Sequence, residues 1–339
     1  MLWPKNTYNV LIETTTYCNA KCPQCSRTNP DGLEYSNVSP LKHITMRDWQ
    51  ESYARSYDKI HHFHFSGQWG DAFMNPDQKD IMYDIIDNSE ATISFSTNGS
   101  MRDGDYWWDI GAKCRDRVIG VFDVDGATQE SHEFYRRNTN LQLVKDNAEA
   151  FAATGATTRI FSLVFKHNQN EIEEIAEWTK SIGATHDFMQ SNRFKRDTFS
   201  KYRYKGVEYT LEQTDDPRYK NTYHKDRPIR DHRHKKVERS EINCHWGKQN
   251  KVFVDINLNV WPCCYWHSNT YVGALPAGEP PRPIYKSYLD KMAEGKFNLK
   301  VKTIDEIMSD SFFDGDLENS FDYRPQPLCN FMCGTLKFD

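Results

Sequence analysis

The first half of the chain alternates between short runs of β-branched and aromatic residues and longer stretches in which apolar residues recur every three or four positions. The short runs have the length and composition of strands, and they fall at residues 10–14, 60–65, 91–96, 117–124, 158–165 and 185–190. The longer stretches have the period of amphipathic helices, and they fall at residues 46–56, 77–88, 105–112, 141–153 and 169–182. This alternation predicts βα units with a parallel sheet and right-handed crossovers.

Six βα units fit within residues 1–190, which is too few for a closed eight-stranded barrel. They predict an α/β fold, either a partial (β/α)6 barrel or a doubly wound sheet, and periodicity alone does not separate the two. In a barrel of this kind the site lies at the carboxyl ends of the strands.

The alternation of predicted strands and helices ends at residue 191. Residues 193–239 contain 15 Lys and Arg against eight Asp and Glu, and five tyrosines lie among them, at positions 202, 204, 209, 219 and 223. A basic, aromatic segment suits a nucleotide or nucleic acid, and a solvated surface loop is the other interpretation. Beyond it, residues 251–254 and 259–262 predict a hairpin, residues 273–283 a loop and residues 303–309 a short helix. The chain therefore divides into residues 1–190, 191–242 and 243–339.

Composition narrows the class of protein. The 339 residues carry a net charge of −5, and no run of about 18 apolar residues predicts a membrane span. The first residues lack a signal-peptide pattern. Nine cysteines in such a chain predict a reducing, cytoplasmic location, where thiols bind metals or react.

Three of these cysteines, Cys18, Cys22 and Cys25, stand in a C-x3-C-x2-C spacing directly after the first predicted strand. Cysteine thiolates hold iron–sulfur clusters, and three ligands leave one iron of a four-iron cluster open if no distant cysteine joins them. A zinc site, a disulfide framework and unrelated cysteines are the alternatives.

The spacing resembles the signature of the radical S-adenosylmethionine (SAM) superfamily. This resemblance implies a [4Fe-4S] cluster whose open iron binds SAM, reductive cleavage of SAM to a 5′-deoxyadenosyl radical, and a flavodoxin- or ferredoxin-type electron donor. It also favours the partial barrel over the doubly wound sheet.

The same resemblance implies contacts to SAM at the ends of later strands. The turn from Gly67 to Asp71 is similar to the superfamily's glycine-rich turn, although Gln68-Trp69 widens the glycine pair and Asp71-Ala72 replaces Glu-Pro. Gln24 also departs from the family pattern, because an aromatic residue usually precedes the third cysteine. The residues implied to bind SAM are Gly67, Gly70, Asp71, Ser96, Thr97, Asn98, Asn168 and one or both of Arg136 and Arg137, which follow Asp125-Gly126 and His132.

The remaining cysteines gather toward the end of the chain. Cys244 precedes the predicted hairpin, Cys263 and Cys264 close it, and Cys329 and Cys333 follow. This arrangement resembles the twitch domain, a shortened SPASM domain with one auxiliary [4Fe-4S] cluster, and implies Cys244, Cys263, Cys329 and Cys333 as its ligands, with Cys264 as a substitute or bystander. Structural zinc is the alternative.

For two histidines and one further cysteine we expect structural roles rather than catalytic or metal-binding ones. His62 and His64 share one side of a strand with alternating faces, and we expect them to be packed or hydrogen-bonded rather than metal ligands. Cys114 falls in a helix and is expected to be a buried thiol.

The sequence thus predicts a radical SAM enzyme, of oxidoreductase or isomerase type, that abstracts a hydrogen atom from a peptide side chain or from a nucleotide or nucleic-acid base. Relatives with SPASM or twitch domains modify peptides, aminosugars or nucleotides, and no motif chooses among them. The alternative is a zinc-stabilised nucleic-acid-binding protein without catalysis.

Overall fold

The structure is a computed structural model that describes residues 2–3, 7–36, 40–191, 193–194, 198–219, 242–272, 282–323, 326, 329 and 333–334. Residues 220–241 of the predicted basic segment and residues 273–281 of the predicted loop lie outside the described residues.

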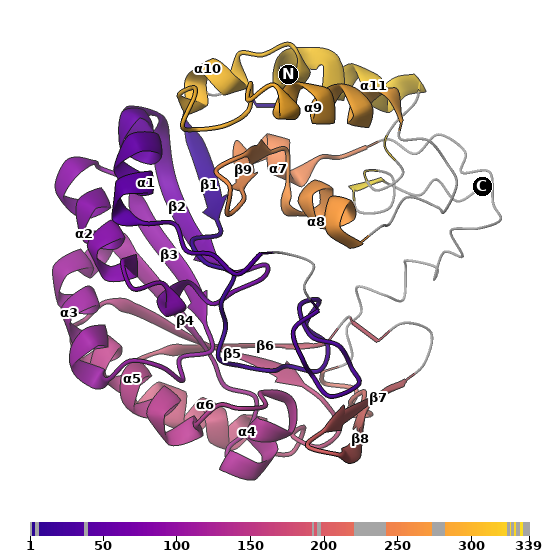
Figure 1. Cartoon of the computed structure of the whole chain (residues 1–339). Helices are drawn as coiled ribbons and strands as arrows, with labels where there is room; N and C mark the ends of the chain where they lie inside the picture. Colours follow the sequence, from indigo (N-terminus) through magenta and orange to yellow (C-terminus); the bar gives the residue numbers. More distant parts are fainter. Residues whose placement is uncertain are drawn as a thin grey trace.

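A curved parallel sheet forms the first half of the chain (Figure 1). Its six strands pair in sequence order and are β1 (Tyr8–Ile12), β2 (Ile60–Ser66), β3 (Thr92–Thr97), β4 (Val118–Asp123), β5 (Thr157–Val164) and β6 (Thr185–Gln190). The intervening helices cover its outer face and are α1 (Met46–Ser52), α2 (Gln78–Asn88), α3 (Gly104–Cys114), α4 (Gln129–Tyr135), α5 (Leu141–Ala153) and α6 (Ile172–Ser181). The predicted partial barrel is confirmed, and the short helix α4 is an addition.

The two faces of the sheet differ in chemistry. On the outer face Phe95 makes edge-on ring contacts with Phe73, Phe122 and Phe151, and all four side chains are fully buried. A Cβ atom on Gly120 would lie 2.6 Å from the ring of Phe95, so only glycine fits beneath this cluster. The opposite, concave face is polar near the amino ends of the strands, a feature that a closed barrel filled by apolar layers would not have.

The predicted hairpin is confirmed, but it continues the barrel sheet. Strand β9 (Lys251–Val254) pairs in parallel with β1 and antiparallel with β10 (Val260–Trp261), so that the sheet has eight strands in the order β10-β9-β1-β2-β3-β4-β5-β6. The turn is closed by Asp255, which accepts from the backbone of Asn257 and Asn259 and from Trp261 Nε1.

Short helices surround this hairpin. They are α7 (His245–Lys248), α8 (Cys264–Val272), α9 (Pro283–Ala293), α10 (Ile304–Met308) and α11 (Leu317–Tyr323). Figure 1 shows α9, α10 and α11 together at one end of the molecule. Stacked and tilted rings of Trp261, Tyr288, Phe297 and Phe312 join them to β10, so one continuous apolar core runs from the barrel into the C-terminal helices.

Part of the predicted basic segment forms a second, two-stranded sheet. Strands β7 (Phe199–Tyr204) and β8 (Val207–Glu212) are joined by Lys205 and Gly206, which both have positive φ, the geometry that favours tight hairpins. Tyr202, Tyr204 and Leu211 of this hairpin are buried with Leu33 in a separate small core. Leu33 belongs to the segment after the three cysteines, so the hairpin packs against the cysteine loop.

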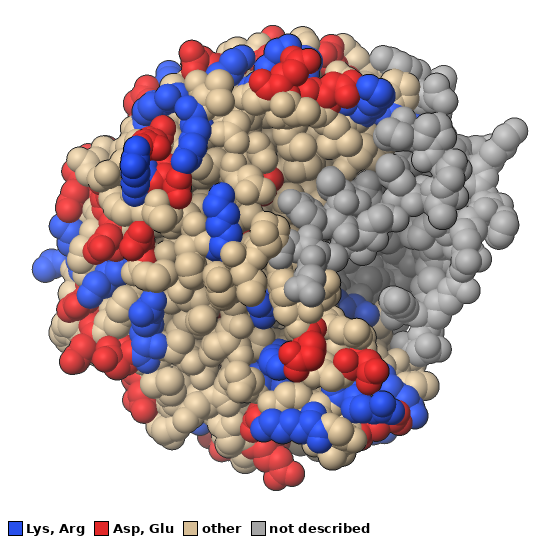
Figure 2. Space-filling model, in the orientation of Figure 1, with Lys and Arg blue, Asp and Glu red and all other residues tan. Residues whose placement is uncertain are grey.

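In the described part of the chain, no helix is both long and apolar enough to cross a bilayer. On the face shown in Figure 2, Lys and Arg side chains are interspersed with Asp and Glu side chains. The described part of this face therefore has no large basic surface.

Candidate functional site

The three N-terminal cysteines lie on the loop that leaves β1 at the carboxyl end of the barrel, and all three thiols are free. The loop is fixed through its carbonyl oxygens. Thr28 Oγ1 donates to the carbonyls of Cys22 at 2.7 Å and Cys25 at 3.0 Å, and Arg27 Nη1 donates to that of Cys18 at 3.2 Å. The sulfur-bearing turn is thus held by hydrogen bonds of its own chain.

Burial keeps the thiols of Cys18 and Cys22 neutral in the absence of a cation. It raises the pKa of Cys22 to about 12 and raises that of Cys18 as well. A bound metal reverses this preference, because a coordinating thiol is deprotonated outright. Three closely spaced soft sulfur donors fit an iron–sulfur cluster.

Among the described residues, no group of three or more His, Cys, Asp or Glu side chains is placed to hold a single metal ion. In a [4Fe-4S] cluster each cysteine binds a different iron atom, so its ligands are spaced around the cluster and do not converge on one metal ion.

The glycine-rich turn after β2 is tightly fitted against the cysteine loop. A Cβ atom on Gly67 would lie 1.3 Å from the carbonyl oxygen of Gly70, and one on Gly70 would lie 2.1 Å from that of Thr15. Glu13, at the end of β1, accepts from the backbone N–H groups of Trp69 and of Gly70, the latter at 3.0 Å. Both glycines are therefore required by close backbone approach.

Asp71 joins this turn to the end of β3. Its buried carboxylate accepts from Thr97 Oγ1 at 2.9 Å, from the Asn98 backbone at 2.8 Å and from Asn98 Nδ2 at 2.7 Å. Asn98 Nδ2 also lies 3.9 Å from Cys18 Sγ. Ser96 is at the end of β3 on the concave face, where its register partner is Ser66. The structure thus brings Gly70, Asp71, Thr97 and Asn98 together beside the first cysteine.

The two predicted arginines lie in different environments. Arg136 Nη1 is 2.9 Å from Asp123 Oδ2, and its Nε is 2.6 Å from Asp125 Oδ2. Burial raises the pKa of Asp123 to about 6, with Arg136 opposing the shift. Arg137 instead donates to the hydroxyl of Tyr202 and lies 4.1 Å from the ring centre of Tyr209. The charge of Arg136 acts on the Cys22 thiol, and the carbonyl of Arg137 accepts from the N–H of Lys21 at 2.8 Å.

Asn168 is buried, and its side-chain amide forms hydrogen bonds with backbone groups. Nδ2 donates to the carbonyls of Asp125 at 2.7 Å and Leu163 at 2.8 Å, and Oδ1 accepts from the N–H of Phe165 at 2.7 Å. In the structure it shapes the turn after β5, and a contact with SAM stays a prediction.

The family model for the Radical SAM superfamily matches residues 12–179, which span the cysteine loop and five of the six βα units. The chain contains a radical SAM domain.

Solved structures agree with this fold. Streptococcus suis SuiB has a TM-score of 0.55 at 14% identity, over 91% of this chain and 67% of its own. The complex of anSMEcpe with AdoMet and the Cp18Cys peptide has a TM-score of 0.53 at 14% identity, over 94% of this chain and 84% of its own. SuiB bound to S-adenosylmethionine gives 0.51 at 14% identity, over 95% and 77% of the two chains. A search of curated protein sequences finds no match.

Three residues of the radical SAM domain and its edge were not predicted from sequence. Glu13 positions the glycine turn, and burial raises its pKa to about 8. Arg27 holds the carbonyl of Cys18. Arg193, just after β6, donates to the carbonyl of Gln24 at 3.2 Å, and its charge acts on Cys22 and Cys25. An acidic residue directly after an apolar strand was a signal for Glu13, whereas nothing local distinguishes Arg193 from the other basic residues around it.

The four predicted auxiliary cysteines lie together. The thiols of Cys244 and Cys333 are hydrogen-bonded, and Cys263 interacts electrostatically with Cys244 and Cys329. Two N–H groups point at the sulfurs: Gly247 donates to Cys244 Sγ at 3.4 Å and Trp266 Nε1 to Cys329 Sγ at 3.3 Å. Cys264 lies beside them: its charge acts on Cys263, and the charge of Lys251 acts on its own thiol.

The other predicted groups follow expectation. His62 is hydrogen-bonded to Thr92 and Ser94, and His64 to Ser94. Cys114 is buried.

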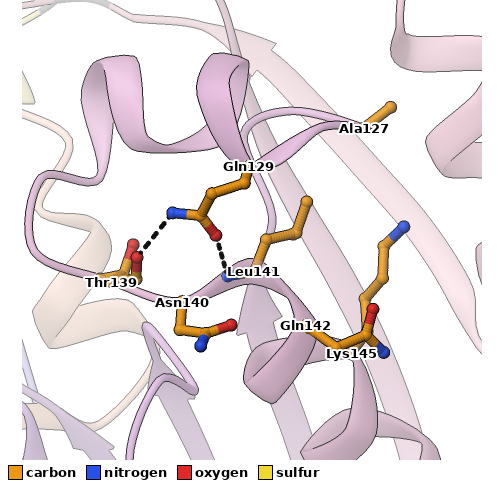
Figure 3. Close-up of a pocket in the computed structure, with 7 residues that line it drawn as sticks. All are labelled: Ala127, Gln129, Thr139, Asn140, Leu141, Gln142 and Lys145. Atoms are coloured by element: carbon orange, nitrogen blue, oxygen red, sulfur yellow. Dashed lines mark hydrogen bonds between the residues drawn. The ribbon is translucent and has the colours of Figure 1, made fainter.

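A cavity of about 470 Å³ lies apart from the cysteines, between the starts of α4 and α5 (Figure 3). Gln129 spans it, donating to the carbonyl of Thr139 and accepting from the N–H of Leu141. Lys145 is the one charged residue in its lining. None of the predicted site residues lines this cavity.

Proposed function

We propose that this protein is a radical SAM enzyme that reductively cleaves SAM and uses the 5′-deoxyadenosyl radical to abstract a hydrogen atom from its substrate. The observation that carries the proposal is the position of Cys18, Cys22 and Cys25: three free thiols on one pinned loop, beside the Asp71–Asn98 network at the carboxyl end of the barrel. A cluster bound there would supply the electron for SAM cleavage.

The protein's own residues would bind and orient the reactants. Cys18, Cys22 and Cys25 would hold the cluster, and the glycine turn would let the backbone approach SAM. Arg193 offers a cation beside Cys22 and Cys25, suited to a carboxylate group. The small apolar core that includes Leu33 and Tyr135 would exclude water behind the loop.

The test is anaerobic reconstitution with iron and sulfide, followed by reduction in the presence of SAM. We expect a brown protein that forms 5′-deoxyadenosine. When Cys18, Cys22 and Cys25 are replaced together by Ala, we expect 5′-deoxyadenosine formation to be abolished and the iron content to fall by about four atoms per chain. Cys114→Ala is the matched control, because this cysteine lies in α3, away from the loop. A protein that binds zinc and never cleaves SAM would contradict the proposal.

We also propose an auxiliary [4Fe-4S] cluster held by Cys244, Cys263, Cys329 and Cys333 in a twitch-type C-terminal part. Mutual proximity of these four thiols and two N–H groups directed at their sulfurs support it, since outer hydrogen bonds tune such clusters. An oxidising cluster would accept the electron of a product radical.

For the substrate, we propose a peptide. The complexes of SuiB with the precursor peptide SuiA and of anSMEcpe with the Cp18Cys peptide have the same fold, although the likeness itself shows the fold alone. A nucleotide or nucleic-acid base is the second candidate, and it rests on the basic segment, of which residues 220–241 lie outside the described residues.

A further inference from the structure

A second cavity, of about 400 Å³, opens near the amino ends of β1, β2, β3 and β9. All of the described residues that line it are polar, and none of them is acidic; they include His61, His62, His64, Thr92, Ser94, Gln249 and Lys251. A polar hollow at the amino ends of barrel strands is unusual, because this region is normally packed for stability rather than shaped for binding.

Lys251 supplies the positive charge of the cavity. No described carboxylate forms an ion pair with it; its ammonium group lies 5.0 Å from the ring centre of Trp246 and acts on the thiol of Cys264. His62 and His64 add no charge at neutral pH, because burial lowers the pKa of His62 to about 4 and of His64 to about 3. The described lining therefore combines the Lys251 cation with uncharged hydrogen-bonding groups and no carboxylate, and this combination favours an anion.

The wall opposite Lys251 is held rigid by a chain of hydrogen bonds. Thr92 Oγ1 and Ser94 Oγ each lie 2.7 Å from a ring nitrogen of His62, and Ser94 Oγ lies 2.6 Å from His64 Nδ1. A hydroxyl has only one proton to donate, so at least one of the two imidazoles must donate to Ser94. The cavity is thus preorganised, which lowers the entropic cost of binding.

The cavity and the candidate SAM site share the concave face of β2. His62, His64 and Ser66 alternate onto this face, and Ser66 directly precedes the glycine turn. Four residues of strand span about 13 Å. A molecule with its anionic end in the cavity would reach the carboxyl end of the barrel with a segment of about that length, which is the size of a short peptide.

We propose that this cavity binds a carboxylate group of the substrate and holds the reacting part toward the SAM end of the barrel. This proposal names a binding site for the peptide substrate proposed above. It depends on that earlier proposal only for the statement that the substrate is a peptide. A carboxylate is favoured over a phosphate because the cavity has a single lysine, with no arginine, no glycine-rich loop and no helix N-terminus in its described lining, and phosphate sites ordinarily combine such groups.

The test is titration of the full-length protein, labelled with 15N-histidine, with sodium acetate at constant ionic strength. We expect saturable shifts of the His62 and His64 imidazole resonances in the wild type, binding weakened at least about tenfold in Lys251→Met, as for loss of one charge-assisted hydrogen bond, and binding retained in Lys251→Arg. Lys145→Met is the matched control, because Lys145 also lies over a tryptophan ring and lines the other cavity; it should bind acetate as the wild type does.

Unchanged acetate binding in Lys251→Met, or no saturable shift in the wild type, overturns the proposal. Tighter binding of inorganic phosphate than of acetate would show that the carboxylate assignment is wrong. The measurement needs neither cluster nor SAM cleavage, so it can fail while the radical SAM function stands, and the reverse also holds.

Discussion

The side chains of Gln68 and His267 meet across 199 positions of the chain, with Gln68 Oε1 2.8 Å from His267 Nδ1. Gln68 Nε2 also donates to the carbonyl of Cys264 at 3.3 Å and to the hydroxyl of Ser268. These contacts give the wider glycine turn a structural role, because the inserted Gln68 joins the turn to α8. The candidate SAM turn is thereby coupled to the segment that begins at the predicted auxiliary ligand Cys263.

Replacing Gln68 should loosen this coupling. We expect Gln68→Leu to lower the free energy of unfolding by about 1–3 kcal/mol, because buried partners on α8 lose their hydrogen bonds, and to weaken SAM binding. Chemical denaturation and equilibrium binding of SAM measure the two effects. Gln142→Leu is the control, since this glutamine bonds only to an exposed neighbour on its own helix and should change stability by less than about 0.5 kcal/mol. Equal effects of the two variants would contradict the coupling.

Glu13 should make stability fall as pH rises. Burial raises its pKa to about 8 in the folded state, from an ordinary value of 4.5, so the folded state retains a proton that the unfolded state loses. Between these values the unfolded state binds fewer protons, and stability decreases with increasing pH by up to about 1.4 kcal/mol per pH unit.

Glu13→Gln cannot ionise and keeps an oxygen that accepts from Trp69 and Gly70. Its melting temperature should therefore decline less than that of the wild type from about pH 5 to about pH 8, and the two curves should separate most at the alkaline end. Glu90→Gln, at an exposed position, should follow the wild-type curve. A Glu13→Gln protein with the wild-type pH dependence would show that this carboxyl ionises normally.

Arg193 should contribute to SAM binding through its charge. We expect Arg193→Gln to weaken SAM affinity about tenfold or more, the order of one charge-assisted hydrogen bond, while the iron content stays the same. Anaerobic equilibrium dialysis of the reconstituted protein measures the affinity. Arg218→Gln is the control from the same part of the chain, because Arg218 is exposed and paired with Asp216 and Glu173. Unchanged affinity in Arg193→Gln would leave Arg136 as the candidate for the SAM carboxylate.

Two adjacent cysteines offer a sharp test of the auxiliary cluster. Cys263→Ala should lower the iron content from about eight to about four atoms per chain, as expected for loss of one four-iron cluster. Cys264→Ala should leave the iron content unchanged, because Cys264 is outside the proposed ligand set and has the charge of Lys251 acting on its thiol. Iron analysis after reconstitution decides between them. An equal loss of iron in both variants would assign a ligand role to Cys264 as well, and no loss in either would argue against the cluster.

Much of this architecture was accessible from local pattern. The six strands and their helices follow from apolar periodicity, which reports which face of each element is buried. Arg136 is a residue whose environment local pattern did not predict. Its position after Asp125-Gly126 suggested a SAM contact, and the fold shows that it forms ion pairs with both Asp123 and Asp125. Local sequence does not record which opposite charges will be buried together.

By itself the sequence determined the chemistry of the N-terminal loop, because Cys18, Cys22 and Cys25 lie within one short turn and their spacing fixes what they can hold. Tertiary structure alone decided that β9 extends the barrel beside β1, that Gln68 meets α8, and that Lys251 faces the histidines of β2 across a polar hollow. Those pairs are separated by about two hundred residues, and their contacts depend on burying one shared core, a property of the whole chain that no short segment encodes.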